Sequence, residues 1–137
     1  MRILVNIDVP DLALAERFYA EAFGLRRGRA FGLDALELLG AEVPMYLLRK
    51  QAGTLGASGV PRDYLRHWTP VHVDVVVDDL DAALIRAIAA GAVQEGAVRD
   101  AGWGRIVQLA DPWGHGWCLL QFLGRGYDEI ADKGGAT

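Results

Sequence analysis

Apolar and more polar residues alternate along residues 3–9, and a period of two predicts a β-strand with one apolar face. Asp11 follows this stretch, and beyond it residues 12–22 carry large apolar side chains at helical spacing. An aspartate carboxylate accepts hydrogen bonds from the free N–H groups at a helix start, and a glycine such as Gly24 commonly ends a helix. The opening pattern therefore predicts a strand followed by a helix.

The same pattern returns in the second half of the chain. Residues 72–80 align without a gap with residues 4–12, and residues 117–120 align in the same way with residues 45–48. Two copies at this long spacing indicate a duplicated module rather than a solenoid, which is built from three or more short repeats. The second copy is expected to open with a strand over residues 71–77.

Three short strands are expected after each predicted helix, separated by turns that contain glycine. In the first copy they cover residues 25–31, 35–39 and 43–49. In the second copy, where the helix is expected over residues 80–90, they cover residues 92–99, 104–110 and 117–123. The chain is therefore interpreted as one domain over residues 1–123 that contains two βαβββ modules, residues 1–50 and 70–123. Residues 51–69 form a linker or lid, and residues 124–137 form a polar C-terminal tail.

Composition narrows the class of protein without naming a ligand. The 137 residues are 52% hydrophobic and 23% charged, which is typical of a globular domain, and no apolar run approaches the ~18 residues of a membrane span. The net charge of -4 disfavours nucleic-acid binding. Because Cys118 is the single cysteine and no signal-peptide pattern opens the chain, we expect a cytoplasmic protein without an internal disulfide.

Three segments carry a family resemblance: DLALAERFYAEAFGL from Asp11, HVDVVVDDLDAALIRAIAAGA from His72, and WGRIVQLADPWGHGWCLLQF from Trp103. The Asp-Pro-x-Gly turn that begins at Asp111 is a strong mark of the same family. Together with the doubled module, these segments resemble the vicinal oxygen chelate superfamily, which includes glyoxalase, extradiol dioxygenases and bleomycin-resistance proteins. The resemblance covers about residues 2–50 and 70–123.

The resemblance implies an α+β fold in which two modules, related by pseudo-twofold symmetry, form a curved mixed sheet around a half-open cavity. It also implies a homodimer. One face of each first strand would pack under the helices, and the other would face the cavity. In the second module the helix-facing residues would be Val71, Val73, Val75 and Val77. The cavity-facing residues would be His72, Asp74 and Val76.

Ligand-binding candidates are residues that the resemblance places on the cavity face of a strand, together with aromatic residues that could form a wall for a flat ligand. They are Asn6, Tyr46, Trp103, Cys118, Leu120 and Phe122. The alternative is that Cys118 is a small apolar filler and that the aromatic side chains only pack, as Trp117 is expected to do in the core.

His72 and Asp74 are the candidates for general acid or base chemistry, since a histidine titrates near neutral pH and the aspartate lies on the same face. The alternative is that both form a polar wall of the cavity. A linker cluster that includes Arg62 and Tyr64 could close over an anionic ligand or form a solvated surface. His115 is most simply a turn residue.

Enzymes of the superfamily usually bind one divalent metal through the first and last strands of each module. Carried over to this chain, the four ligand positions are Leu4, Tyr46, His72 and Cys118. Leu4 has no lone pair, and the phenol of Tyr46 must ionise from a pKa near ~10 before it binds a metal. Because a catalytic metal site needs about three protein ligands, no metal or other cofactor is predicted. A partial site of His72 with Asp74 or Cys118 stays as an alternative.

The function predicted from these observations is binding of a small molecule, or metal-independent catalysis of the glyoxalase or bleomycin-resistance type, in an aromatic-lined cavity. The alternative is a metal-dependent lyase, isomerase or dioxygenase with a non-standard site around His72. A third hypothesis is an accessory module that has lost its site. The expected partners are a small-molecule ligand and a second copy of the chain, with no nucleic acid and no membrane.

Overall fold

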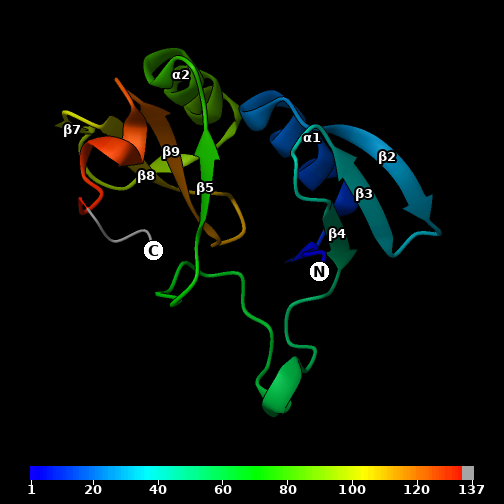
Figure 1. Cartoon of the computed structure of the whole chain (residues 1–137). Coiled ribbons are helices and arrows are strands. Elements are labelled where there is room, and N and C mark those ends of the chain that lie inside the picture. Colours follow the sequence, from blue (N-terminus) through cyan, green and yellow to red (C-terminus); the bar gives the residue numbers. More distant parts are fainter. Residues whose placement is uncertain (134–137) are drawn as a thin grey trace.

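Two βαβββ modules joined by a linker make up the computed structural model, which describes residues 1–133 (Figure 1). The first module consists of β1 (Val5–Val9), α1 (Leu12–Phe23), β2 (Arg26–Phe31), β3 (Ala35–Leu39) and β4 (Met45–Arg49). The second consists of β5 (Val73–Val76), α2 (Leu80–Ala90), β6 (Val93–Gln94), β7 (Arg99–Ala101), β8 (Gly104–Ala110) and β9 (Gly116–Phe122), so the two short strands β6 and β7 together take the place that β2 has in the first module. The predicted α+β class and the doubled module are confirmed.

Both helices begin and end where the sequence pattern predicts. The Asp11 carboxylate accepts a hydrogen bond from the Leu14 N–H at 2.9 Å, and Asp79 caps α2 in the same way. Gly24 follows α1 with a φ of 71°, a left-handed conformation in which glycine avoids the strain of a side chain. These local signals place each helix directly after the first strand of its module.

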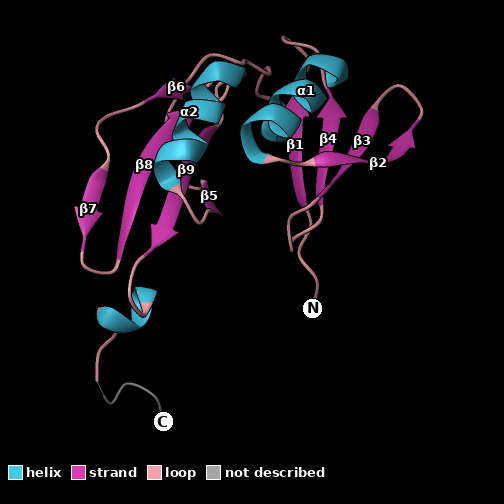
Figure 2. Cartoon of the chain, turned by 90° about the horizontal axis from the view of Figure 1, so that it is seen from above, coloured by secondary structure: helices cyan, strands magenta, loops and turns pink. Residues whose placement is uncertain are grey.

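Each module forms its own mixed sheet. The strand order is β1-β4-β3-β2 in the first module and β5-β9-β8-β6 in the second, where β7 also pairs with β8. The first strand of each module lies parallel to the last, and the other pairs are antiparallel. No ladder joins β1 to β5 in the part of the chain that the structure describes, so the mixed sheet structure consists of two separate open sheets, one from each module (Figure 2).

One hydrophobic core serves both modules. The helices α1 and α2 contact each other and cover the sheets on the same side. From α1, Phe18 and Tyr19 reach the second module, and the ring centroids of Tyr19 and Trp117 lie 5.5 Å apart. Trp117 is 3% exposed, as expected of a core residue. This shared core fixes the two modules relative to each other and therefore shapes the space between them.

Three expectations about the second module need correction. Val71 is 76% exposed rather than packed under the helices, because β5 begins only at Val73. The strand expected over residues 92–99 is broken into β6 and β7, with Gly96 between them at a φ of 96°. The last strand begins at Gly116 and ends at Phe122, one residue earlier at each end than predicted.

The linker, residues 51–69, contains one short 3₁₀ turn, Ala57–Gly59, and lies below the two sheets in Figure 1. After β9, a second 3₁₀ turn, Gly126–Glu129, occupies the first part of the predicted tail. Residues 134–137 of that tail lie outside the described residues. Within residues 1–133, neither helix is long and apolar enough to cross a membrane.

Candidate functional site

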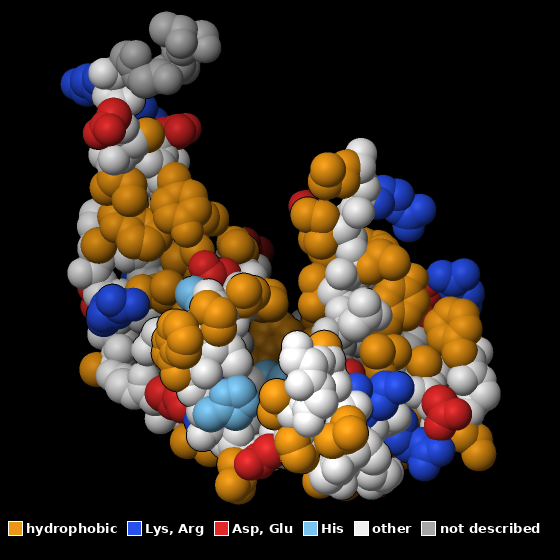
Figure 3. Space-filling view, turned by 90° about the horizontal axis from the view of Figure 1, so that it is seen from below, with side chains coloured by type: hydrophobic (Ala, Val, Ile, Leu, Met, Phe, Trp, Pro, Cys, Tyr) orange, Lys and Arg blue, Asp and Glu red, His pale blue; other side chains and the backbone are white. Residues whose placement is uncertain are grey.

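A cleft of about 780 Å³ lies between the two modules. It is bordered by β1, by β5 with the residues just before it, by the linker and by the turn that precedes β9. Figure 3 shows this hollow, with hydrophobic side chains at its bottom and histidine side chains beside it. All three histidines of the chain, which are His67, His72 and His115, line the cleft.

A buried carboxylate holds His115 in place. The side chain of Asp111 has no exposed surface, and one of its oxygens lies 2.8 Å from His115 Nδ1. The other donors to Asp111 are the Tyr19 hydroxyl, Trp117 Nε1 at 3.0 Å, and the backbone N–H groups of Trp113 and His115 at 2.9 and 3.0 Å. The network ties α1, the turn and β9 together at one side of the cleft.

The charge of Asp111 is maintained by its donors. Burial alone raises the pKa of a carboxyl group, but the hydrogen bonds from His115, Tyr19 and Trp117, together with the attraction of His115 in its protonated form, hold the pKa of Asp111 below its ordinary value. The same surroundings raise the pKa of the Tyr19 phenol well above its usual range, through burial and the nearby Asp111 charge. Asp111 is therefore an acceptor and Tyr19 a donor at neutral pH.

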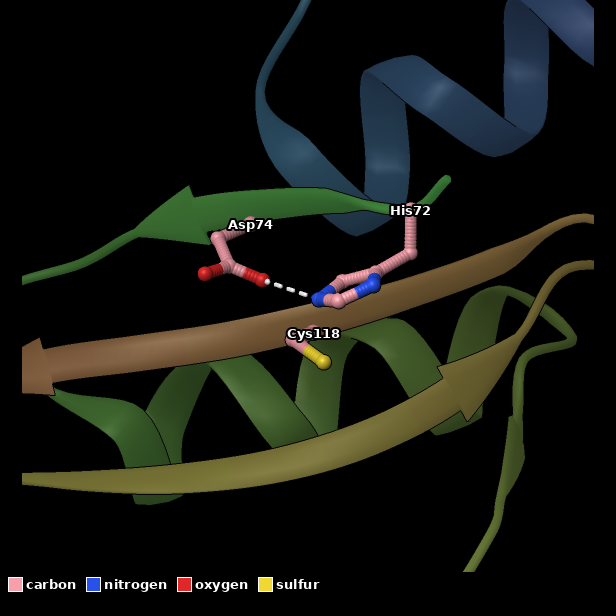
Figure 4. A group of neighbouring side chains, drawn as sticks. All are labelled: His72, Asp74 and Cys118. Carbon is pink, nitrogen blue, oxygen red and sulfur yellow. Dashed lines mark ion pairs between the residues drawn. The ribbon is translucent and has the colours of Figure 1, made fainter. Parts of the chain in front are cut away.

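A second cluster joins the predicted His72 and Asp74 with Cys118. His72 Nε2 lies 3.2 Å from Asp74 Oδ1, and the ligand atoms of all three residues lie within 4.8 Å of one another (Figure 4). Burial, followed by the charge of Asp74, raises the pKa of the Cys118 thiol to about 11. The thiol is therefore protonated at neutral pH and does not act as a thiolate nucleophile in this state.

In the first module, Leu4 and Tyr46 occupy the positions that align with His72 and Cys118, and their side chains have a different chemistry. The Tyr46 hydroxyl lies 3.3 Å from Glu37 Oε2, and the Arg29 guanidinium donates hydrogen bonds to the same carboxylate through Nε and Nη2. The hydrogen bonds and charge of Arg29 lower the pKa of Glu37 to about 2. Tyr46 is thus engaged in a protein network, and Leu4 offers no lone pair, so these two positions do not fit a metal ion.

The linker is fastened to both modules. Arg62 Nε lies 2.9 Å from Asp8 Oδ2 on β1, and Arg62 Nη1 donates to the Leu55 carbonyl at 2.6 Å. Arg66 forms an ion pair of 2.9 Å with Glu95, which follows β6. The guanidinium of Arg62 is therefore neutralised by Asp8 rather than free to take up an anionic ligand.

The ligand-binding residues predicted from sequence fall into separate places. Asn6 and His72 line the cleft, whereas Cys118 and Leu120 are buried. Trp103 and Phe122 lie outside the cleft lining, where both rings contact Tyr127 with centroid separations of 5.2 and 4.8 Å. An aromatic cluster is thus present, but the rings that line the cleft itself are those of Tyr64, Trp113 and Trp117.

Sequence reasoning missed the role of Asp111 and treated His115 as a turn residue. The one available signal was their spacing of four residues within a turn that contains glycine. It also missed Glu37 and Arg29, which hold Tyr46. These partners become visible only when distant segments are placed together.

Comparison with known proteins assigns the fold to a family. A family model described as a glyoxalase-like domain matches residues 4–120. An uncharacterized protein of Mycobacterium bovis is 35% identical over 130 residues, covering 85% of this chain and 80% of that protein.

Solved structures of other proteins show a similar fold. A fosfomycin resistance protein of Mesorhizobium loti is 18% identical, with a TM-score of 0.67 over 96% of this chain and 97% of its own. A glyoxalase/bleomycin resistance protein/dioxygenase family enzyme of Burkholderia phytofirmans is 17% identical, with a TM-score of 0.65 over 88% of this chain and 97% of its own. The chain therefore belongs to the glyoxalase-like family within the vicinal oxygen chelate superfamily.

Proposed function

We propose that this protein binds a small organic molecule in the cleft between its two modules. The observation that carries the proposal is the cleft itself, whose volume of about 780 Å³ lies in the range of ligand sites. Its walls combine apolar side chains such as Ile7 and Val73 with the polar Asn6, Tyr64 and His115. An apolar surface with a few placed polar groups is the usual composition of a small-molecule site.

We propose further that binding, and any turnover that follows it, does not depend on a metal. Members of the superfamily often use a metal ion and are commonly dimeric. In this chain the first-module positions Leu4 and Tyr46 supply no free ligand atom, which supports metal-independent chemistry. A homodimer and a cytoplasmic location belong to the same proposal, on the strength of superfamily membership and the single cysteine.

Tryptophan fluorescence tests the proposed cleft. We expect para-nitrophenol, para-nitroanisole or a larger flat aromatic compound to quench the emission saturably, because Trp113 lines the cleft and is partly exposed. Trp117, the other tryptophan of the lining, is only 3% exposed. Trp113→Phe should remove most of the quenching, whereas Trp103→Phe should retain it. Absence of saturable quenching by every compound would contradict the proposal. Quenching lost only in Trp103→Phe would instead place the ligand beside Tyr127.

A metal site in the second module is the alternative function. It is supported by the convergence of His72, Asp74 and Cys118, whose nitrogen, oxygen and sulfur donors reach the number of protein ligands in a catalytic zinc site. When bound there, a zinc ion would act as a Lewis acid for an oxygen of the substrate. His72 and Asp74 would hold the ion, and the Cys118 thiol would lose its proton on binding.

Zinc retention tests this alternative. If the site is a metal site, about one zinc ion per chain should remain after loading and gel filtration, and His72→Ala and Cys118→Ala should each weaken zinc binding at least about tenfold. Tyr46→Phe is the matched control, because Tyr46 occupies a family ligand position but contacts Glu37 instead. If the wild-type protein retains less than about a tenth of an equivalent of zinc, the metal alternative is wrong.

A further inference from the structure

The ring of His115 has one nitrogen engaged and one open. Nδ1 lies against the Asp111 carboxylate, whereas Nε2 has no hydrogen-bond partner within residues 1–133. In that same part of the chain no buried side-chain nitrogen or oxygen lacks a partner, so the unpaired Nε2 is reached by solvent. His115 lines the cleft with 30% of its side chain exposed.

The Asp111 contact determines which tautomer His115 adopts. A carboxylate accepts hydrogen bonds only, so the neutral imidazole carries its proton on Nδ1 and presents the lone pair of Nε2 to the cleft. An acceptor in this position recognises a ligand through an O–H or N–H donor. If the donor is acidic enough, the same nitrogen takes its proton, and the imidazolium that forms is balanced by Asp111.

The charges around the cleft indicate what kind of donor fits. Arg62 is the one lysine or arginine that lines the cleft within the described residues, and it is paired with Asp8. A carboxylate or phosphate ligand would therefore meet no fixed unpaired cation there. A hydroxyl group on an apolar body matches both the open Nε2 and the apolar walls formed by side chains such as Trp113.

We propose that His115 is the proton acceptor of this cleft and that its ligand carries a weakly acidic hydroxyl group, phenolic or enolic, on an apolar body. Asp111 is the positioning residue that orients His115. The proposal rests on the proposed function, since it names the ligand chemistry of the same cleft. On binding, the ligand O–H donates to Nε2. When the proton transfers, the oxygen keeps the electron pair of the broken O–H bond and the new N–H bond forms at Nε2.

Two side chains of the linker also approach the Asp111–His115 pair. The guanidinium of Arg66 approaches Gly116 and interacts electrostatically with Asp111. Tyr64 faces the imidazole of His115, and the centroids of the two rings lie 6.5 Å apart. Its phenol is neutral at neutral pH, because burial and the Asp8 charge raise the pKa of Tyr64.

Two matched probes test whether a hydroxyl group on the ligand contributes to binding in the cleft. Para-nitrophenol and para-nitroanisole have the same aromatic body, but the second carries a methyl group in place of the acidic proton. The wild-type protein should bind para-nitrophenol about tenfold more tightly, the effect of one hydrogen bond of ordinary strength. The absorbance of bound para-nitrophenolate should also persist to lower pH than that of the free probe, because the imidazolium stabilises the anion.

His115→Asn is the informative variant, since its amide N–H still donates to Asp111 but no basic nitrogen faces the cleft. We expect the preference for para-nitrophenol to fall below about twofold, with the affinity for para-nitroanisole retained. Equal affinity of the wild-type protein for both probes would overturn this inference and leave the proposed function standing. If neither probe binds, the inference fails, whereas the proposed function fails only if no compound of the fluorescence series quenches the emission saturably.

A measurement without ligand tests the role of Asp111. Nitrogen-15 NMR of the wild-type protein distinguishes the two neutral tautomers of a histidine. His115 should carry its proton on Nδ1. A neutral His115 protonated on Nε2 would overturn the inference, because that nitrogen would then be a donor.

Discussion

Replacing Asp111 with alanine is expected to lower the free energy of unfolding by about 4 kcal/mol. Five donors converge on the Asp111 carboxylate, and they come from α1, the turn and β9. Alanine leaves the Tyr19 hydroxyl and Trp117 Nε1 buried without an acceptor. Each buried unsatisfied group destabilises a protein by about 1–3 kcal/mol.

Urea denaturation of Asp111→Ala and of Asp34→Ala measures this effect. Asp34 is the matched control, because its ion pair with Arg49 is exposed and such pairs contribute about 0–1 kcal/mol. The stabilisation by Asp111 should also depend on pH. Because its native pKa lies below the ordinary value, the contribution is complete above about pH 4 and is lost as the pH falls through the native pKa. Equal loss of stability in the two variants would contradict the assigned role of Asp111.

Gly114→Ala is expected to destabilise the protein by about 2–4 kcal/mol and to displace the linker from the cleft. Gly114 has a φ of 83°, and a Cβ there would lie 2.7 Å from the carbonyl oxygen of Leu65 and 2.8 Å from that of Tyr64. Those oxygens belong to the backbone of the linker, which must move to admit a methyl group. The variant should therefore weaken the binding of any ligand that the linker helps to enclose.

Gly32→Ala is the matched control for this prediction. Gly32 also has a positive φ, 61°, but a Cβ there would meet no atom within 4 Å. The free energy of unfolding of Gly32→Ala should fall only by the cost of the backbone strain, about 1–2 kcal/mol. Limited proteolysis should cut the linker faster in Gly114→Ala than in Gly32→Ala. Equal cleavage rates in the two variants would show that the linker does not rest on Gly114.

The fold could be predicted in large part because its signals are local. The alternation in residues 3–9 and the caps at Asp11 and Asp79 determine where strands and helices begin, and the repeat gives the module order. Three details depend on context that the pattern lacks. Gly96 breaks a strand, Val71 precedes the sheet rather than joining it, and β1 and β5 do not pair.

The sequence pattern predicted the candidate site only where its partners lie two residues apart along the chain. His72 and Asp74 share a face by simple alternation, and the structure brings their side chains together. The Asp111 network depends instead on Tyr19, which lies in the other module and approaches only through the shared core. Likewise, Glu37 meets Tyr46 because β3 pairs with β4, a register that the sequence pattern did not define.

Chemical-shift mapping gives the most direct test of ligand binding in the cleft. The tightest-binding compound of the fluorescence series would be titrated into the nitrogen-15-labelled protein. We predict saturable shifts of amide signals from β1, the linker and His115, which border the cleft. Shifts confined to Trp103, Phe122 and Tyr127 would contradict the account, because they would place the ligand outside the cleft that separates the two modules.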